Sequence, residues 1–110
     1  MMKFGQLFLH RGEWNGEQIL PEAWIIKSAV PEFYFPQTGR RGHRGYSYGW
    51  WPFTEQYGRG AYAARGWGGK EIIVMPEHDM VVVFTGGSYW SSPLLTTYQM
   101  MIQYVLRSID

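Results

Sequence analysis

The chain has 110 residues and a formal net charge of +1, enough for one modest domain or for a piece of a larger one. So small a charge gives no field that would draw it to nucleic acid or to an anionic membrane, and we expect neither partner. No cysteine is present, which excludes disulfides, thiol nucleophiles and cysteine-bound metals. We recognise no signal peptide, and no apolar run approaches the ~20 residues that span a bilayer.

Aromatic residues are unusually frequent: six Trp, eight Tyr and six Phe stand beside fourteen Gly. Such a chain has ample apolar surface to bury, which argues against disorder. The same composition would also suit a carbohydrate-binding face, so a binding module stays open as an alternative.

A helix is predicted at the N-terminus, where Met1, Phe4 and Phe8 follow helical spacing and Gly12 suits a left-handed residue after its end. No capping residue precedes this helix, which leads us to expect that the natural sequence continues upstream. The dipeptide Asn15-Gly16 then predicts a tight turn, because both residues tolerate positive φ.

A second helix is expected from Pro21 to about Ala29, because proline suits the first helical turn and Pro31 stops the helix. Its buried side is predicted to hold Trp24, Ile25 and Ser28.

Residues 31–45 form a loop rich in Pro, Gly and Arg. Its basic cluster could bind an anion. The short cluster and its irregular spacing favour the alternative that these side chains are simply solvated. The cluster consists of Arg40, Arg41, His43 and Arg44.

Antiparallel strands follow the loop. Residues 46–53 are predicted as one aromatic strand and residues 61–65 as a short one, separated by a turn at 57–60. Two apolar runs, 70–75 and 80–85, form a hairpin, and because neither alternates cleanly we expect both faces of the sheet to be covered.

A final helix is predicted over residues 93–108, with Ser92 as N-cap and Pro93 at the first helical position. Its apolar residues step by three and four: Leu94, Tyr98, Met101, Val105 and Ile109. The fold class is therefore α+β, with an antiparallel sheet of about three strands flanked by N-terminal helices and a C-terminal helix.

Residues 45–49 match Gly-x-Ser-x-Gly, the nucleophile elbow of α/β-hydrolases. That motif requires a strand-to-helix turn, and the Trp-Trp-Pro-Phe that follows cannot open a helix, so we interpret Ser47 as an accidental match. The three histidines lie far apart without ligand spacing, so no metal site is predicted.

The segment from Gly66 to Lys70, Gly-Trp-Gly-Gly-Lys, is more informative. Several glycines entering a strand suggest the close approach of a ligand or of another backbone. An edge strand can also point a backbone N–H at a developing oxyanion. The plainer interpretation is a glycine bulge with Trp67 as a core anchor.

Four segments stand in order before the terminal helix: MMKFGQLFLHRGEWNGEQIL, PEAW, YSYGWW and ARGWGGKEIIVMPEHDMVVVFTGG. With these segments, the chain as a whole resembles the C-terminal third of the serine β-lactamase-like hydrolases. This family includes class C β-lactamases, penicillin-binding proteins, type B esterases and 6-aminohexanoate-oligomer hydrolases. The resemblance implies that residues 1–110 are the C-terminal portion of such a hydrolase domain.

In this family a third active-site motif lies on a strand at the edge of the cleft. It reads Lys-Thr-Gly in β-lactamases and Trp-Gly-Gly in several esterases and amidases, which Trp67, Gly68 and Gly69 match. The resemblance implies that these residues contact substrate and that the backbone N–H of Lys70 donates to the oxyanion. A register one residue earlier, beginning at Gly66, stays open.

The resemblance further implies that Tyr48 and Trp50 supply aromatic walls of the substrate pocket. The absence of Lys-Thr-Gly favours a parent enzyme that hydrolyses a small-molecule ester or amide through an acyl-serine, without a cofactor.

The family's nucleophile and base are missing, because Ser-x-x-Lys and Tyr-x-Asn occur nowhere in the chain. None of the six serines has lysine three residues on: Ser28, Ser47, Ser88, Ser91, Ser92 and Ser108. We therefore predict a fragment that is inactive alone and that either lacks an N-terminal part or pairs its open sheet with another copy. The alternative is a self-standing aromatic-rich binding or interaction module.

Overall fold

The computed structural model describes residues 1–34, 44–53, 55–90 and 95–109. Its class is α+β, as predicted. The first elements are α1 (Met2–Leu9), β1 (Glu13–Trp14), β2 (Glu17–Gln18), α2 (Glu22–Ala29), β3 (Phe33–Tyr34) and β4 (Gly45–Tyr46). The main sheet and its connections follow as β5 (Trp51–Pro52), β6 (Tyr62–Gly66), β7 (Lys70–Met75) and β8 (Met80–Thr85), with short 3-10 turns at Glu55–Tyr57 and Pro76–His78.

The chain ends in a helix that begins as α3 (Thr97–Met100) and continues through a π-helical segment, Met101–Val105, and a 3-10 turn, Leu106–Ser108. We call residues 97–108 the C-terminal helix. Among the described residues, no helix is long and apolar enough to cross a membrane.

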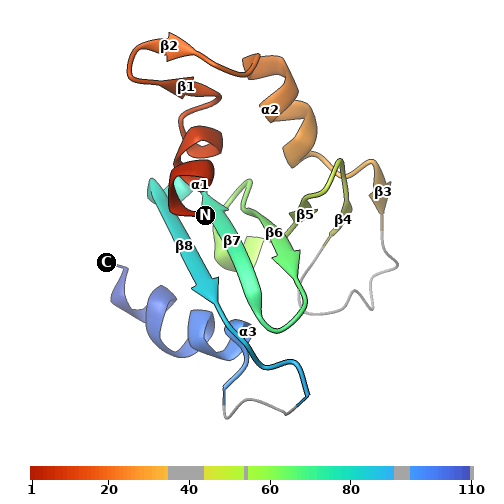
Figure 1. Cartoon of the computed structure of the whole chain (residues 1–110), viewed down its shortest axis with the longest axis vertical. Coiled ribbons are helices and arrows are strands. Elements are labelled where there is room, and N and C mark those ends of the chain that lie inside the picture. The colour runs from red at the N-terminus through yellow and green to blue at the C-terminus, as the bar shows by residue number, and fades with distance from the viewer. Residues whose placement is uncertain (35–43, 54, 91–94, 110) are drawn as a thin grey trace.

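The main sheet is antiparallel, with strand order β5-β6-β7-β8 (Figure 1). The hairpin of β7 and β8 has the predicted bounds, and its register runs from Lys70 opposite Thr85 to Met75 opposite Met80. Proline fixes the first residue of the connecting 3-10 turn, and Asp79 closes it with φ of +48°. The sheet has three strands of five or six residues and a two-residue fourth, β5.

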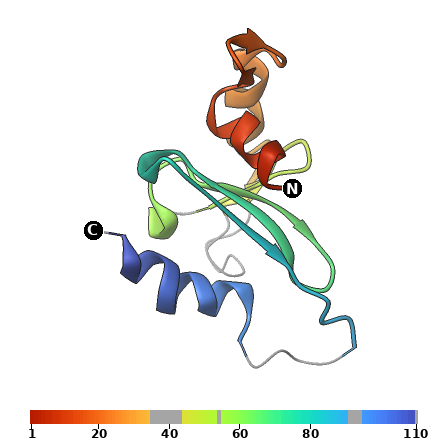
Figure 2. The ribbon, with the colours of Figure 1, turned by 60° about the vertical axis from the view of Figure 1, so that its left-hand side comes forward.

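Helices cover both faces of this sheet, as Figure 2 shows for the N-terminal helices and the C-terminal helix. On the first face, Phe8 of α1 and Ile25 of α2 pack with Trp50, Tyr62 and Val74. On the second face, the C-terminal helix packs Met101 against a cluster that includes Ile73 and Met75. The expectation that both faces are covered is confirmed, and the core is divided in two by the sheet.

A close approach of α1 to the sheet depends on Gly5. A Cβ at this position would lie 2.5 Å from Cγ1 of Val81 and 2.9 Å from Cγ2 of Ile72. Only glycine lets the helix lie this near the strands, so α1 spans the junction of β7 and β8.

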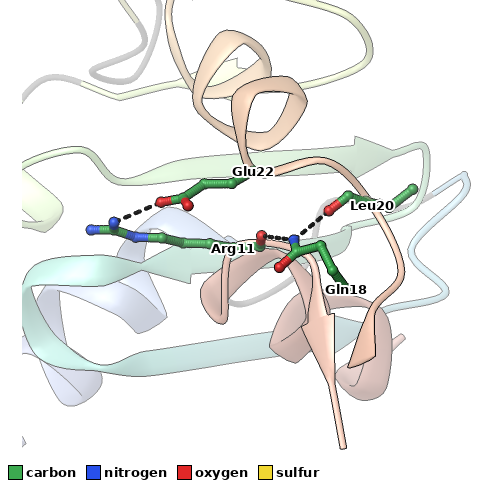
Figure 3. A network of polar contacts seen from close by, with 4 residues as sticks. All are labelled: Arg11, Gln18, Leu20 and Glu22. Atoms are coloured by element: carbon green, nitrogen blue, oxygen red, sulfur yellow. Dashed lines mark hydrogen bonds and ion pairs between the residues drawn. The ribbon is translucent and has the colours of Figure 1, made fainter. Parts of the chain in front are cut away.

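The predicted end of α1 and the turn after it are confirmed. Arg11 and Gly12 both have positive φ after the helix, and Asn15 and Gly16 form the two-residue turn between β1 and β2 with φ of +50° and +80°. A polar network then ties this hairpin to α2 (Figure 3). In it, the side-chain amide of Gln18 donates to the carbonyl oxygens of Arg11 and Leu20, and the Arg11 guanidinium pairs with Glu22 at 2.8 Å.

The prediction of one strand over residues 46–53 was wrong. The chain reverses at Tyr48 and Gly49, which have φ of +44° and +92°, and β4 and β5 are separate strands on either side of this turn. Ser47 and Trp50 exchange backbone hydrogen bonds of 2.9 and 2.7 Å across it. The aromatic residues suggested a strand, but a tight turn with glycine at its second position fits the same sequence.

The start of the last helix also differs from the prediction. Thr96 caps it through a capping box in which its hydroxyl accepts from the backbone N–H of Gln99 at 3.2 Å, and the Gln99 side chain accepts from Thr96 N–H at 2.8 Å. Ser92, Pro93 and Leu94 lie outside the described residues. Of the remaining predicted apolar positions, all four pack on the sheet: Tyr98, Met101, Val105 and Ile109.

Two further predictions concern α2 and the basic loop. Ile25 and Ser28 are buried as predicted, but Trp24 is 41% exposed and packs at the rim against the Tyr48 ring. Arg40, Arg41 and His43 lie outside the described residues. The backbone N–H of Arg44 donates to the Pro52 carbonyl at 2.7 Å, joining β4 to β5.

Candidate functional site

The predicted Trp-Gly-Gly motif forms the turn between β6 and β7. Gly66 and Lys70 face each other at its base, and Trp67, Gly68 and Gly69 lie between them. Gly68 and Gly69 have φ of +86° and +83°, a backbone conformation that residues with a side chain rarely adopt. The glycines therefore serve first to close this hairpin.

The segment that leaves β8 packs directly on this turn. A Cβ on Gly86 would lie 2.6 Å from the carbonyl oxygen of Gly68, and the backbone N–H of Ser88 donates to that same oxygen at 3.1 Å. The Tyr89 ring covers Gly68, because a Cβ there would meet its Cε1 at 2.7 Å. The segment that follows β8, about twenty residues further along the chain, thus holds the β6–β7 turn in place.

An open pocket of about 430 Å³ lies against this turn. Its walls come from three parts of the chain: the β6–β7 turn, the segment after β8, and the beginning of the C-terminal helix. Its lining residues include Arg65, Trp67, Gly69, Glu71, Ser88 and Thr97. Their side chains supply an indole, two hydroxyl groups and an ion pair, a mixture that suits a small polar organic molecule.

The ion pair at the pocket joins Arg65 to Glu71 across β6 and β7. The Arg65 Nε donates to Glu71 Oε1 at 2.6 Å, with the two side chains 26% and 7% exposed. A carboxylate this deeply buried needs such a partner, since an unpaired buried charge is very costly. Burial raises the pKa of the neighbouring Tyr57 hydroxyl well above its ordinary value of 10, and the Glu71 charge raises it further.

Exposed aromatic residues surround Trp67, which lines the pocket. Trp67 is 66% exposed, and its ring meets the rings of Tyr89 and Trp90 edge-on, with centroids 5.7 and 5.1 Å apart. The Lys70 ammonium donates to the Tyr89 hydroxyl and lies 3.5 Å from the Trp67 carbonyl oxygen. Trp67 is therefore a surface residue, which contradicts its interpretation as a core anchor.

The structure brings some of the predicted site residues together and separates others. Trp67, Gly68 and Gly69 line the pocket. Lys70 begins β7, which pairs with β6 on one side and β8 on the other, so it lies on an inner strand of the sheet. The strand whose partner stops short is β6, because β5 pairs only with its first two residues.

Tyr48 and Trp50 lie away from this pocket. Trp50 is 4% exposed and packs in the core between α1 and β6, in ring contact with Phe8 and Tyr62. Tyr48 sits in the β4–β5 turn, where a hydrogen bond from Lys27 to its hydroxyl raises the pKa of that lysine. The Trp50 side chain is buried in the core, so Trp50 does not line the pocket beside Trp67.

The serine of the accidental elbow motif is structural. Ser47 is fully buried, and its hydroxyl donates to the Lys27 carbonyl at 3.3 Å. Ser28 and Ser108 donate to backbone carbonyls of their own helices. Within the described parts of the chain, no serine hydroxyl has a lysine or histidine partner that would activate it.

Other polar clusters have structural roles. Glu77 accepts from the Arg59 backbone N–H at 2.7 Å, and this bond, with the Arg59 guanidinium, holds the pKa of the carboxyl below its ordinary value of 4.5. Among the described residues no three histidine or carboxylate side chains gather as they would around a metal ion.

Sequence reasoning missed the Arg65–Glu71 pair and the contribution of Ser88 and Thr97 to the pocket. A signal for the pair was available: a three-residue turn that starts after Gly66 places Arg65 opposite Glu71. The other two residues come from segments that only the tertiary fold brings to the turn.

Comparison with protein-family models and with curated proteins finds no match. Among solved structures, the chain is similar to a putative 6-aminohexanoate-dimer hydrolase from Bacillus anthracis, at 30% sequence identity and a TM-score of 0.64. The match covers 98% of this chain and 26% of that chain, so this sequence spans about a quarter of the length of the solved hydrolase. That hydrolase is of the β-lactamase fold, and the α+β architecture described above is compatible with a part of such a fold.

Proposed function

We propose that this chain is the C-terminal segment of a serine hydrolase related to the β-lactamases, and that its β6–β7 turn forms part of the substrate site. The observation that carries the proposal is the agreement of two independent features. The chain is similar over 98% of its length to a hydrolase of this fold, and the Trp-Gly-Gly segment that resembles the family's third motif lines a pocket.

The oxyanion donor in this proposal is a backbone N–H of the turn. The two registers left open by the sequence assign it to Lys70 or to Gly69. Lys70 belongs to an inner strand and its position faces Gly66 in the hairpin, whereas Gly69 lines the pocket outside the strand pairing. We therefore favour Gly69 as the donor, with Trp67 as the adjacent substrate-contacting side chain.

The chemistry of the parent enzyme is hydrolysis of an ester or amide through an acyl-serine. This chain supplies neither the Ser-x-x-Lys nucleophile nor the Tyr-x-Asn base. Loss of a nucleophile and its base removes catalysis by orders of magnitude, even where an oxyanion site persists. We accordingly propose that the isolated chain binds small esters and amides weakly and does not turn them over.

The test is hydrolysis of nitrocefin and of short p-nitrophenyl esters by the purified chain. The expected rate equals the buffer rate, and a Ser88→Ala variant is included because Ser88 is the described serine that lines the pocket. Turnover by the unmodified chain that disappears in this variant would overturn the proposal.

Binding gives a second measurement. In an NMR titration with the small amide N-butylacetamide, we expect chemical-shift changes at the backbone N–H groups of Gly69 and Trp67. We expect none at Tyr48, which does not line the pocket. Shifts centred on Tyr48 instead would place the ligand elsewhere and contradict the assignment of this turn.

A second candidate function is an aromatic binding module, and one observation favours it. Trp67, Tyr89 and Trp90 are all exposed, and the Trp67 ring contacts the rings of the other two, an arrangement that can stack on a sugar. Titration with short β-glucan and chitin oligosaccharides, followed by tryptophan fluorescence, separates the candidates. Sugar binding lost in Trp90→Ala, with no response to esters or amides, would favour the module.

A further inference from the structure

The peptide group between Gly68 and Gly69 has a fixed orientation in the β6–β7 turn. Its carbonyl oxygen accepts a hydrogen bond from the backbone N–H of Ser88 at 3.1 Å. The peptide is trans, and in a trans peptide the carbonyl oxygen and the N–H point in opposite directions. The N–H of Gly69 therefore points away from the backbone N–H of Ser88.

The Gly69 N–H is also available to a ligand. Among the residues that the structure describes, no group accepts a hydrogen bond from it. Gly69 lies outside the strand pairing of the hairpin and lines the pocket. A backbone donor that lines a pocket and has no acceptor within the chain is suited to bind an oxyanion.

The turn by itself does not fix this orientation. Neither Gly68 nor Gly69 has a Cβ, so the peptide between them can rotate into the reversed orientation at little steric cost. The carbonyl oxygen of Gly68 would then take the place of the Gly69 N–H. A carbonyl oxygen repels a developing oxyanion, so a reversed peptide would abolish the proposed donor.

Segment 86–89, which follows β8, supplies the constraint that the turn lacks. A Cβ on Gly86 would lie 2.6 Å from the carbonyl oxygen of Gly68 and 2.9 Å from that of Gly69. Both carbonyl groups therefore lie against the backbone of Gly86, closer than a side chain there would allow. The Tyr89 ring covers Gly68 itself, where a Cβ would meet the ring at 2.7 Å.

A lysine of β7 holds the end of this segment. The Lys70 ammonium donates to the Tyr89 hydroxyl and lies 4.2 Å from the centre of the Tyr89 ring. It also donates to the Trp67 carbonyl oxygen at 3.5 Å. The Lys70 side chain thus connects the turn to the ring that covers it.

We propose that segment 86–89 orients the Gly68–Gly69 peptide so that the Gly69 N–H can donate to the developing oxyanion, with Gly86 and Tyr89 as positioning residues. The role of the N–H rests on the proposed function, whereas its orientation depends on contacts within this chain alone. These positioning residues act through Gly69. The pairing of β6 with β7 does not include them, so the hairpin should persist when their contacts are lost.

Two alanine variants form a matched pair. In Gly86→Ala the new Cβ collides with two backbone carbonyl oxygens, whereas in Gly87→Ala it meets only Cε2 of Tyr89, at an ordinary 3.8 Å. Neither glycine has a φ in the left-handed region, so alanine suits the backbone at both positions. Only Gly86→Ala should therefore displace the peptide.

Amide hydrogen exchange of the full chain, followed by NMR, measures the bond from Ser88. We expect its N–H to be protected in the unmodified chain and in Gly87→Ala, after correction for the intrinsic exchange rates. In Gly86→Ala this protection should fall by roughly tenfold or more, and the scalar coupling between Ser88 N and Gly68 C′ should disappear. The amides of β7 should keep their protection, which shows that the variant is folded.

A second variant covers the case in which Gly86→Ala does not fold. Tyr89→Phe keeps the ring over Gly68 but removes the hydroxyl to which Lys70 donates. The loss of this one hydrogen bond at an exposed site should lower the protection of Ser88 N–H by roughly threefold to tenfold. An unchanged protection in a folded Tyr89→Phe would contradict the role of Tyr89.

Titration with N-butylacetamide separates this inference from the proposed function. The chemical-shift change at Gly69 N–H should be reduced in Gly86→Ala and unchanged in Gly87→Ala. An unprotected Ser88 N–H in the unmodified chain, or an undiminished Gly69 response in Gly86→Ala, would overturn the positioning role. No response of Gly69 in the unmodified chain would contradict the proposed function instead, and the exchange of Ser88 N–H would still decide whether segment 86–89 orients the peptide.

Discussion

The strands β7 and β8 have nearly the same kind of sequence and very different surroundings. Each is a six-residue run dominated by apolar residues, and they pair with each other along their whole length. Residues from Ile72 to Met75 on β7 are at most 9% exposed, whereas Met80 to Phe84 on β8 are only partly buried. The difference comes from strand order, because among the described residues β7 has a neighbouring strand on each side and β8 on one side.

This comparison shows how the position of a strand in a sheet sets how much its side chains contribute to stability. The same β-branched residue loses far more water-exposed area on an inner strand than on an outer one. It also separates the roles of the hairpin: β7 anchors the fold and carries Glu71 into the pocket, whereas β8 is the outermost strand of the described sheet.

The largest effect is expected from Ile73→Ala on β7, compared with Val82→Ala at the position opposite it on β8. Ile73 is completely buried, so its truncation leaves a cavity and should lower the free energy of unfolding by about 2–5 kcal/mol. Val82 is smaller and partly solvated, and its truncation should cost about 1–2 kcal/mol. Urea denaturation measures both losses. Equal losses would show that β8 is as buried as β7.

A smaller effect is expected from Glu71→Gln at the pocket end of β7. The variant keeps the shape but replaces the charge-assisted bond that Arg65 Nε donates to Glu71 at 2.6 Å by a bond to a neutral amide, which should cost about 1–3 kcal/mol in thermal or urea unfolding.

The double variant Arg65→Met with Glu71→Leu is the control for that prediction. It replaces the pair by apolar side chains and should recover most of the lost stability. An unchanged stability in Glu71→Gln would mean that the pair contributes nothing to the anchoring of β7.

The smallest effect concerns the turn between the two strands. Glu77 has a pKa below its ordinary value, so its contribution to stability is present above pH 4.5 and is lost as the pH falls below that value. Glu77→Gln should therefore flatten the fall of the melting temperature between about pH 5 and pH 3. Glu17→Gln removes the same charge from the β1–β2 hairpin as a control. Because Glu77 is exposed, solvent screens the effect, and identical pH profiles for both variants would contradict it.

Much of the local structure was predictable. The bounds of β7 and β8 follow from two apolar runs separated by Pro76 and a polar turn, and the Asn15-Gly16 turn follows from residues that accept positive φ. The capping box at Thr96 and Gln99 was also readable as a Thr-x-x-Gln pattern, although the prediction placed the helix start earlier. The turn at Tyr48 was missed because aromatic composition was read as strand propensity.

The candidate site was predictable only in part. The sequence marks the Trp-Gly-Gly segment, but it does not show that the glycines close a hairpin or that Gly86 and Ser88 pack on them from another segment. Trp50 was expected at a pocket wall, yet it fills the core under α1. Aromatic residues suit both places, and only the packing of distant segments decides between them.

The sequence by itself determined the bounds of β7 and β8, the turn at Asn15-Gly16, the absence of the Ser-x-x-Lys and Tyr-x-Asn motifs, and the α+β class. These depend on residues close together in the chain. The tertiary structure alone decided that β7 is inner and β8 outer, that Arg65 and Glu71 meet at a pocket, and that Trp67 is exposed while Trp50 is buried. The physical reason is that a strand's periodicity reports its two faces, whereas the partners along its two edges are fixed by distant segments.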